Sequence, residues 1–193
     1  MNLRRSLGIL FAAFFVFGAT SLAAPSEADA FVRLGADGIW VPVAGTQVSQ
    51  GDAKLDSSHE LASFGGSIHG NLGFDAFSAG LKLNYFSEGM ELEADGEKVR
   101  RNEVDINAMM RFGIPTTKLG LFAEGGASMS TKFDGVGYNI GVGAEYTLVS
   151  AAILDFNAGL SGQYVNLPAE INGISTDNKT VRGLIFLGVD FGL

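Results

Sequence analysis

The final stretch of the chain, residues 180–193 (TVRGLIFLGVDFGL), alternates between two kinds of residue with a period of two. A β-strand points successive side chains to opposite faces, so one face of this stretch carries only apolar residues and glycine. These residues are Val181, Gly183, Ile185, Leu187, Val189, Phe191 and Leu193. The opposite face includes Arg182 and Asp190. The pattern predicts one strand of a β-barrel whose outer surface meets lipid.

Seven earlier stretches show the same alternation, and each is long enough for the roughly 9–11 residues of a membrane-spanning strand. They cover residues 31–43, 61–73, 77–86, 102–114, 119–130, 137–148 and 153–165. In every one of them the charged residues fall on a single parity. We therefore predict an all-β chain that forms an eight-stranded, antiparallel, up-and-down transmembrane β-barrel.

The predicted connections alternate in length along the chain. Short connections are expected at 73–77, 115–118 and 149–152, and longer ones at 44–60, 87–101, 131–136 and 166–179. Outer-membrane barrels have short periplasmic turns and longer external loops, so both ends of the barrel domain are expected on the periplasmic side. The outward aromatic residues then form two belts, at the levels where rings meet the membrane surfaces. The periplasmic belt comprises Phe74, Phe77, Phe112, Tyr146, Phe156 and Phe191, and the external belt Trp40, Phe64, Tyr85, Tyr138 and Tyr164.

The first thirty residues have the order of a secretory signal peptide. Arg4 and Arg5 precede an apolar run over 7–18, and small residues follow. The run is shorter than the ~20 residues of a spanning helix, which disfavours the alternative of an uncleaved anchor. We predict a signal peptide over 1–30, cleaved after Ala30 or alternatively after Ala23, and a barrel domain over 31–193. The expected location is the outer membrane.

Composition excludes several classes of function. The 193 residues include no cysteine, which rules out disulfides and thiolate metal sites. The formal net charge is −8, and no basic run extends beyond Arg100 and Arg101, so a nucleic-acid partner is not expected. We predict no cofactor and no metal site.

The inward parity carries most of the charge of the predicted barrel. Its charged residues are Arg33, Lys82, Arg111, Arg182, Asp37, Glu103, Asp105, Glu124, Glu145, Asp155 and Asp190. The lumen of an eight-stranded barrel is just wide enough for side chains to fill it. Buried charges must pair, so we expect a salt-bridged, water-containing plug, with a narrow gated pore as the alternative. Inward glycines are expected to leave room for the long charged side chains; they are Gly65, Gly113, Gly126, Gly143 and Gly188.

Two features could carry chemistry or binding. Ser67 and His69 share an inward face, and a carboxylate such as Glu124 could orient the imidazole. A histidine inside a polar network is the favoured interpretation, and we predict no catalytic residue and no enzyme. The segment 88–101 places five acidic residues before three basic ones. It could bind divalent cations that bridge lipopolysaccharide or form a hairpin tip for adhesion, although a solvated loop is favoured.

Taken together, the signal peptide, the eight alternating strands, the turn lengths and the aromatic-x-apolar ending resemble small outer-membrane barrels of Gram-negative bacteria, of the OmpA-anchor and OmpX type. The chain ends in Leu193, where those proteins usually end in Phe. The resemblance implies a structural or surface-interaction role, contact with outer-membrane lipid and lipopolysaccharide, and assembly by the barrel-assembly machinery through the last strand. It also implies a monomer. The alternatives are a lipid-modifying barrel enzyme and a soluble periplasmic β-barrel carrier.

Overall fold

The computed structural model describes residues 30–50, 53–58, 63–74, 76–92, 97–131, 135–171 and 174–192. These residues form nine strands: β1 (Ala30–Gln50), β2 (Ala53–Ser58), β3 (Ser63–Phe74), β4 (Phe77–Leu92), β5 (Glu97–Gly113), β6 (Leu119–Ser130), β7 (Val136–Ala151), β8 (Leu154–Ile171) and β9 (Ile174–Gly192). Among them, no helix has the length and apolar character needed to cross a membrane.

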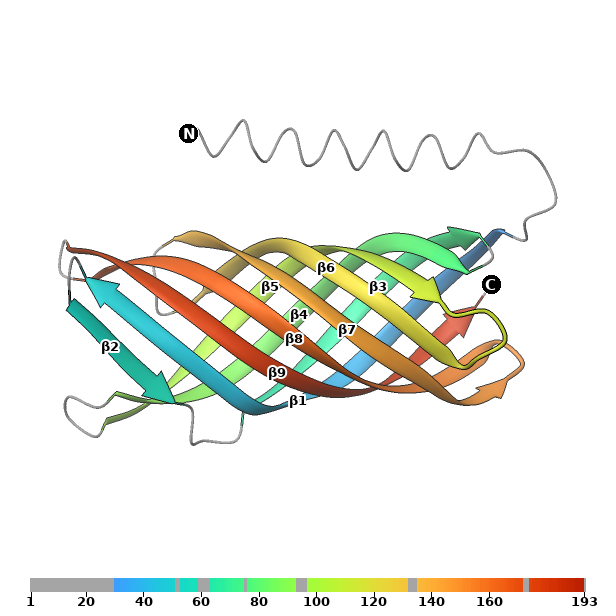
Figure 1. Ribbon diagram of the computed structural model, residues 1–193, viewed down its shortest axis with the longest axis horizontal. Coiled ribbons are helices and arrows are strands. Elements are labelled where there is room, and N and C mark those ends of the chain that lie inside the picture. Colours follow the sequence, from blue (N-terminus) through green and yellow to red (C-terminus); the bar gives the residue numbers. More distant parts are fainter. Residues whose placement is uncertain are drawn as a thin grey trace, which may run out of the picture.

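Eight of these strands form a closed antiparallel barrel (Figure 1). The strands from β3 to β9 pair in chain order, and β1 pairs with both β3 and β9, which closes the sheet. The short β2 pairs only with the last six residues of β1, from Gly45↔Ser58 to Gln50↔Ala53. A closed barrel leaves no unpaired sheet edge, which satisfies the backbone without solvent. The predicted fold class is confirmed.

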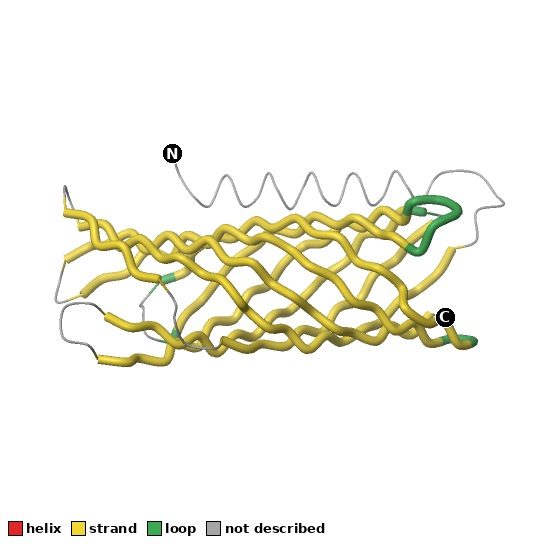
Figure 2. Tube along the Cα trace, turned by 60° about the horizontal axis from the view of Figure 1, so that its bottom comes forward, coloured by secondary structure: helices red, strands yellow, loops and turns green. Residues whose placement is uncertain are grey.

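Three of the connections predicted as long loops are largely strand. β1 and β2 occupy most of 44–60, β4 and β5 continue into 87–101, and β8 and β9 continue into 166–179. The physical reason is that backbone pairing continues beyond the region where one face must be apolar, so the alternation ends before the ladder does. The strands are strongly tilted, and these hairpins project from one end of the barrel (Figure 2). We call this the hairpin end, and the opposite end, where β1 begins and β9 ends, the terminal end.

The turns at the terminal end are short and tightly bonded. Between β5 and β6 the amide of Ile114 donates to the carbonyl of Leu119, and the Thr117 hydroxyl donates to the carbonyl of Ile114. Thr116 in this turn and Ala152 in the turn between β7 and β8 have positive φ angles, of 65° and 52°. These turns match the predicted short connections.

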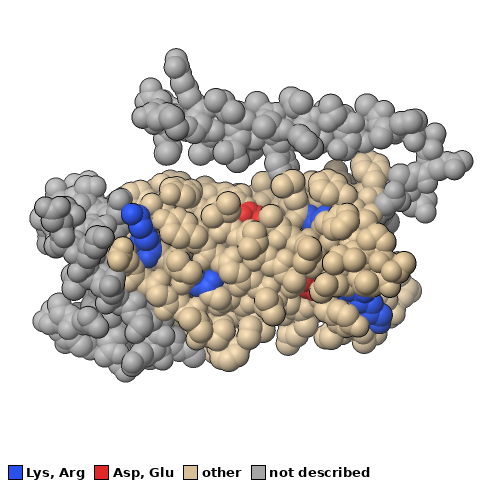
Figure 3. Space-filling model, viewed as in Figure 1, with Lys and Arg blue, Asp and Glu red and all other residues tan. Residues whose placement is uncertain are grey.

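The predicted assignment of faces is confirmed. Leu187 and Ile140 lie on the outer wall with 64% and 60% of their surface exposed, whereas Arg111 and Glu145 are buried inside. The face of the barrel seen in Figure 3 accordingly shows only a few charged atoms among many uncharged ones. The predicted belt residues also face outward, with Phe77 opposite Phe112 near the terminal end and Trp40 opposite Phe64 further along the wall.

The predicted signal peptide and its cleavage sites lie outside the described residues, except for Ala30, where β1 begins. The predicted boundary at residue 30 remains a prediction. The tip of the acidic and basic hairpin over 93–96 also lies outside the described residues.

Candidate functional site: the interior of the barrel

An ionic cluster fills the barrel near the terminal end, and Asp190 is at its centre. The carboxylate of Asp190 accepts hydrogen bonds from Arg111 at 3.1 Å and from Asn157 at 3.0 Å, and it lies 2.7 Å from Nε2 of His69. Arg33 lies 3.7 Å from Asp190 and 3.6 Å from Asp155. Arg111 also pairs with Glu145. We call this the terminal cluster.

A second ionic group lies deeper in the barrel and contains Lys82. Its Nζ atom is 3.7 Å from Asp37 and 3.5 Å from Glu124. Asp37 also accepts a hydrogen bond from the Ser67 hydroxyl. Nδ1 of His69 lies 3.6 Å from Asp37. The imidazole therefore connects this middle cluster to the terminal cluster.

An apolar layer lies next to the middle cluster. The rings of Phe122 and Phe186 pack edge to face, with centroids 5.8 Å apart, and Nζ of Lys82 lies 5.4 Å and 5.5 Å from the two rings. The buried apolar cluster comprises Ile39, Val41, Ala44, Phe86, Met109, Phe122, Leu184 and Phe186. Facing the two packed rings are glycines on the neighbouring strands, Gly143 and Gly159, where a Cβ would overlap the rings.

A third ionic group lies toward the hairpin end around Arg182. Its guanidinium is 2.9 Å from both Glu103 and Asp105, and its Nε donates to Gln163 at 2.7 Å. The guanidinium also lies 3.7 Å from the centre of the Phe86 ring. Arg182, Glu103 and Asp105 are each at most 1% exposed. We call this third group the Arg182 cluster. Its charges are fully buried and each has an oppositely charged partner, because an unpaired buried charge would be costly.

The predicted inward charges therefore do face inward, and the ion pairs of the predicted plug are present. The prediction did not include the apolar layer, which lies between two of the ionic clusters. Parity alone places Phe122 and Phe186 inside, so the sequence contained the signal for this layer.

The role predicted for the inward glycines holds only in part. Gly188 accommodates the Asp37 carboxylate, but Gly65 and Gly143 face the rings of Phe86 and Phe122, and Gly126 faces Asn107. A Cβ on Gly113 would have as its nearest neighbour the Ala76 carbonyl oxygen at 3.7 Å. Aromatic rings, rather than charged side chains, therefore use much of the space.

The arrangement around Ser67 and His69 differs from the predicted alternative. The imidazole contacts Asp190 and Asp37, while the carboxylate of Glu124 lies beside Lys82. The Ser67 hydroxyl donates to Asp37 rather than to His69. A general base must be within hydrogen-bond reach of the proton that it removes. Ser67 and His69 thus share a carboxylate but do not form a nucleophile and base pair.

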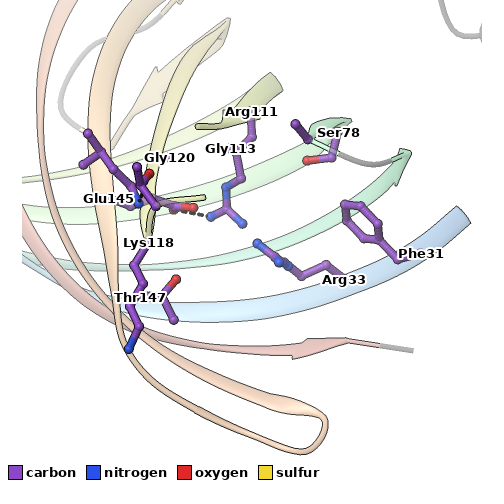
Figure 4. A pocket seen from close by; sticks show the side chains of 12 residues that line it. Phe31, Arg33, Ser78, Arg111, Gly113, Lys118, Gly120, Glu145 and Thr147 are labelled. Carbon is purple, nitrogen blue, oxygen red and sulfur yellow. Dashed lines mark hydrogen bonds and ion pairs between the residues drawn. The ribbon is translucent and has the colours of Figure 1, made fainter. Parts of the chain in front are cut away.

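A cavity of about 180 Å³ opens at the terminal end (Figure 4). Arg33 and Arg111 extend into it from the strand walls, and the pair between Arg111 and Glu145 lies on one side. Phe31 and Lys118 also line it. Three members of the terminal cluster, Arg33, Arg111 and Glu145, line this cavity, so the cluster is accessible from the terminal end. Within the described part of the chain, no group of three potential metal ligands is found.

No protein-family model matches the chain, and no curated protein matches it. Solved structures do match. The outer-membrane protein OprG from Pseudomonas aeruginosa aligns with a TM-score of 0.51 and 11% identity, over 86% of this chain and 97% of that protein. The outer-membrane protein AlkL, solved in lipid bilayers, aligns with a TM-score of 0.50 and 10% identity, over 88% of this chain and 94% of that one. The fold of this chain is that of the small eight-stranded outer-membrane β-barrels.

Proposed function

We propose that this protein is an integral outer-membrane β-barrel with a structural or surface-interaction role, inserted with its hairpin end outside the cell. The observation that supports this most directly is the inversion of polarity. Charged side chains are paired inside the barrel, and large apolar side chains cover its outside. Soluble surfaces rarely expose a continuous apolar area of this kind. A soluble carrier would require the opposite assignment of faces.

The length of the strands supports the surface role. β1 has 21 residues and β9 has 19, about twice the roughly 9–11 residues needed to cross a bilayer. The remainder extends mainly at the hairpin end. These projecting hairpins are the part of the molecule that an extracellular partner would meet first.

The interior supports a closed barrel rather than an open channel. Three ionic clusters and the apolar layer occupy successive levels of the lumen. Displacing a buried ion would remove at least one ion pair from a region of low dielectric constant, which is costly because the remaining charges stay buried. Reconstitution in planar bilayers tests this point, and we expect no steady conductance.

A non-enzymatic role is part of the same proposal. Its support is the Ser67 hydroxyl, which donates to Asp37 and is not aligned with the imidazole. A lipid A mass spectrum from cells with and without the protein tests it. Unchanged acylation and phosphorylation are expected, and a change that disappears in His69→Gln would establish the enzyme instead.

Cell fractionation tests the location. We expect the protein in the outer-membrane fraction, extracted only by detergent, with gel mobility that changes on heating. Recovery from the soluble periplasm would overturn the proposal. The same material can report on assembly, since we propose that the barrel-assembly machinery recognises β9 and that the barrel is a monomer.

A further inference from the structure

Two glycines interrupt the side chains of the outer wall between β7 and β9. Gly162 of β8 lies opposite Gly183 of β9, and both face outward. A Cβ on Gly162 would meet nothing within 4 Å, and one on Gly183 would have as its nearest neighbour the Val43 carbonyl oxygen at 4.0 Å. Two adjacent wall positions therefore carry no side chain and have room for one.

Gly162 lines an apolar groove of about 380 Å³ in the wall, and Gly183 lies opposite it on β9. Val142 pairs with Gly162 along one side, and Tyr164 and Val181 pair with each other in the next row toward the hairpin end. Ile140 continues that row on β7. All these side chains belong to the groove lining. A straight hydrocarbon chain fits a groove that is apolar on its floor and on its sides.

The next set of outward cross-strand pairs, on the hairpin side of the groove, is polar. Asn166 pairs across the strands with Tyr138 on one side and Lys179 on the other. Its amide donates to the Tyr138 hydroxyl at 3.5 Å, and the rings of Tyr138 and Tyr164 lie 6.3 Å apart. Lys179 is the only charged residue on the outward parity of the strands among the side chains that the structure describes. Hydrogen-bond donors and a cation thus lie next to the apolar groove, on its hairpin side.

We propose that this surface is a binding site for one lipid of the external leaflet, the lipid A part of lipopolysaccharide. An acyl chain lies along Gly162 and Gly183, and a phosphate of the head group contacts Lys179 and Asn166. This inference rests on the proposed orientation, which places the hairpin end outside. Lys179, the one cation on the outward parity among the described side chains, favours an anionic head group, and its position places that head group on the hairpin side of the groove.

Native mass spectrometry of the intact, folded protein in detergent tests the site. The probes are hexa-acylated lipid A with two phosphates and the same lipid with both phosphates removed. We expect one molecule of phosphorylated lipid A per barrel. Lys179→Gln should weaken its binding about fivefold, the factor expected for one lysine beside an anionic membrane surface. The dephosphorylated lipid should bind the wild type as weakly as phosphorylated lipid A binds the variant.

The matched control is Lys118→Gln, which removes an exposed lysine at the terminal end and should leave binding unchanged. A double variant, Gly162→Val with Gly183→Val, fills the groove and should weaken both lipids equally. Heat-modifiable gel mobility verifies that each variant is folded. Equal binding by Lys179→Gln and wild type, or equal effects of the two lysine variants, would overturn the inference.

Failure of the site and failure of the proposed function give different results. A protein that fractionates with the outer membrane but binds lipid A without regard to Lys179 retains the proposed function and loses only this site. A protein recovered from the soluble periplasm loses both.

Discussion

His69 and Asp190 meet directly across Gly35, with Nε2 of the imidazole 2.7 Å from the carboxylate Oδ1. Gly35 pairs with His69 on β3 and with Asp190 on β9, so the contact connects two strands that are separated by β1. A Cβ on Gly35 would overlap both the imidazole and the carboxylate. The absence of a side chain at this position is therefore a condition for the contact.

Gly35→Ala should destabilise the barrel by about 1–3 kcal/mol, the usual range for overpacking a filled interior. The measurement is urea unfolding in lipid vesicles, followed by heat-modifiable gel mobility. Gly38→Ala is the matched control on the same strand, because a Cβ there points outward and its nearest neighbour is 4.0 Å away. Equal unfolding free energies for the two variants would contradict the packing argument.

Arg182 gives a prediction about buried charge. Arg182→Met removes the cation that Glu103 and Asp105 share, in a region that is at most 1% exposed, and leaves Glu103 paired with Arg101 at 3.1 Å. Breaking a buried ion pair by removing one partner typically costs about 3–5 kcal/mol. The same unfolding assay should show that loss. Lys179→Met, on the same strand but facing outward, should change stability by less than about 0.5 kcal/mol. A loss below about 1 kcal/mol for Arg182→Met would indicate that the carboxylates find other partners.

These two residues also show how far the sequence can predict this fold. Period-two alternation placed Arg182 inside, because parity is a local property of one strand. It could not identify Glu103 and Asp105 as partners, because these lie on β5, across the lumen, and depend on the stagger of the closed barrel. The same limit explains why Glu124 was a plausible partner for His69 in sequence but lies beside Lys82 in the structure. The strands continue beyond the part of the barrel whose outer face is apolar. The sequence did not predict this extension, because the alternation of apolar and polar residues stops where the outer face is no longer apolar.

Phe186 gives a prediction about the apolar layer inside the barrel. The alternation of residues places Phe186 inside, but the prediction of a charged plug did not include it. Phe186→Ala should cost about 3–5 kcal/mol, because it leaves a cavity between Phe122, Gly159 and Lys82. Phe64→Ala removes an aromatic ring from the outer wall, where lipid can replace it, and should cost much less. A double-mutant cycle with Phe122→Ala should give a coupling of about 0.5–1.5 kcal/mol for the edge-to-face pair. Zero coupling would show that the two rings contribute only by their separate burial.

The outer wall gives a prediction that depends on the membrane. Leu187→Arg places a cation in the middle of the apolar stretch of β9, at a position 64% exposed on the outside. The cost of arginine on a lipid-facing strand is about 2–4 kcal/mol at the bilayer midplane and falls toward the interfaces. Phe191→Arg, near the terminal end of the same strand, should therefore cost less. The comparison of unfolding free energies in vesicles measures the difference. A larger loss for Phe191→Arg would place the membrane at a different height on the barrel.

The predicted cleavage of a signal peptide can be tested at the amino terminus of the protein. β1 begins at Ala30 and is paired from that residue, with Ala30 opposite Phe74. Cleavage after Ala30 therefore gives a mature chain in which the first residue, Phe31, already belongs to the barrel. Cleavage after Ala23 would add seven residues, 24–30, to that chain. The intact mass of protein extracted from the outer membrane distinguishes the two, and we expect the chain that begins at Phe31. A mass that retains residues 1–30 would show that the segment acts as an anchor, which its short apolar run disfavours.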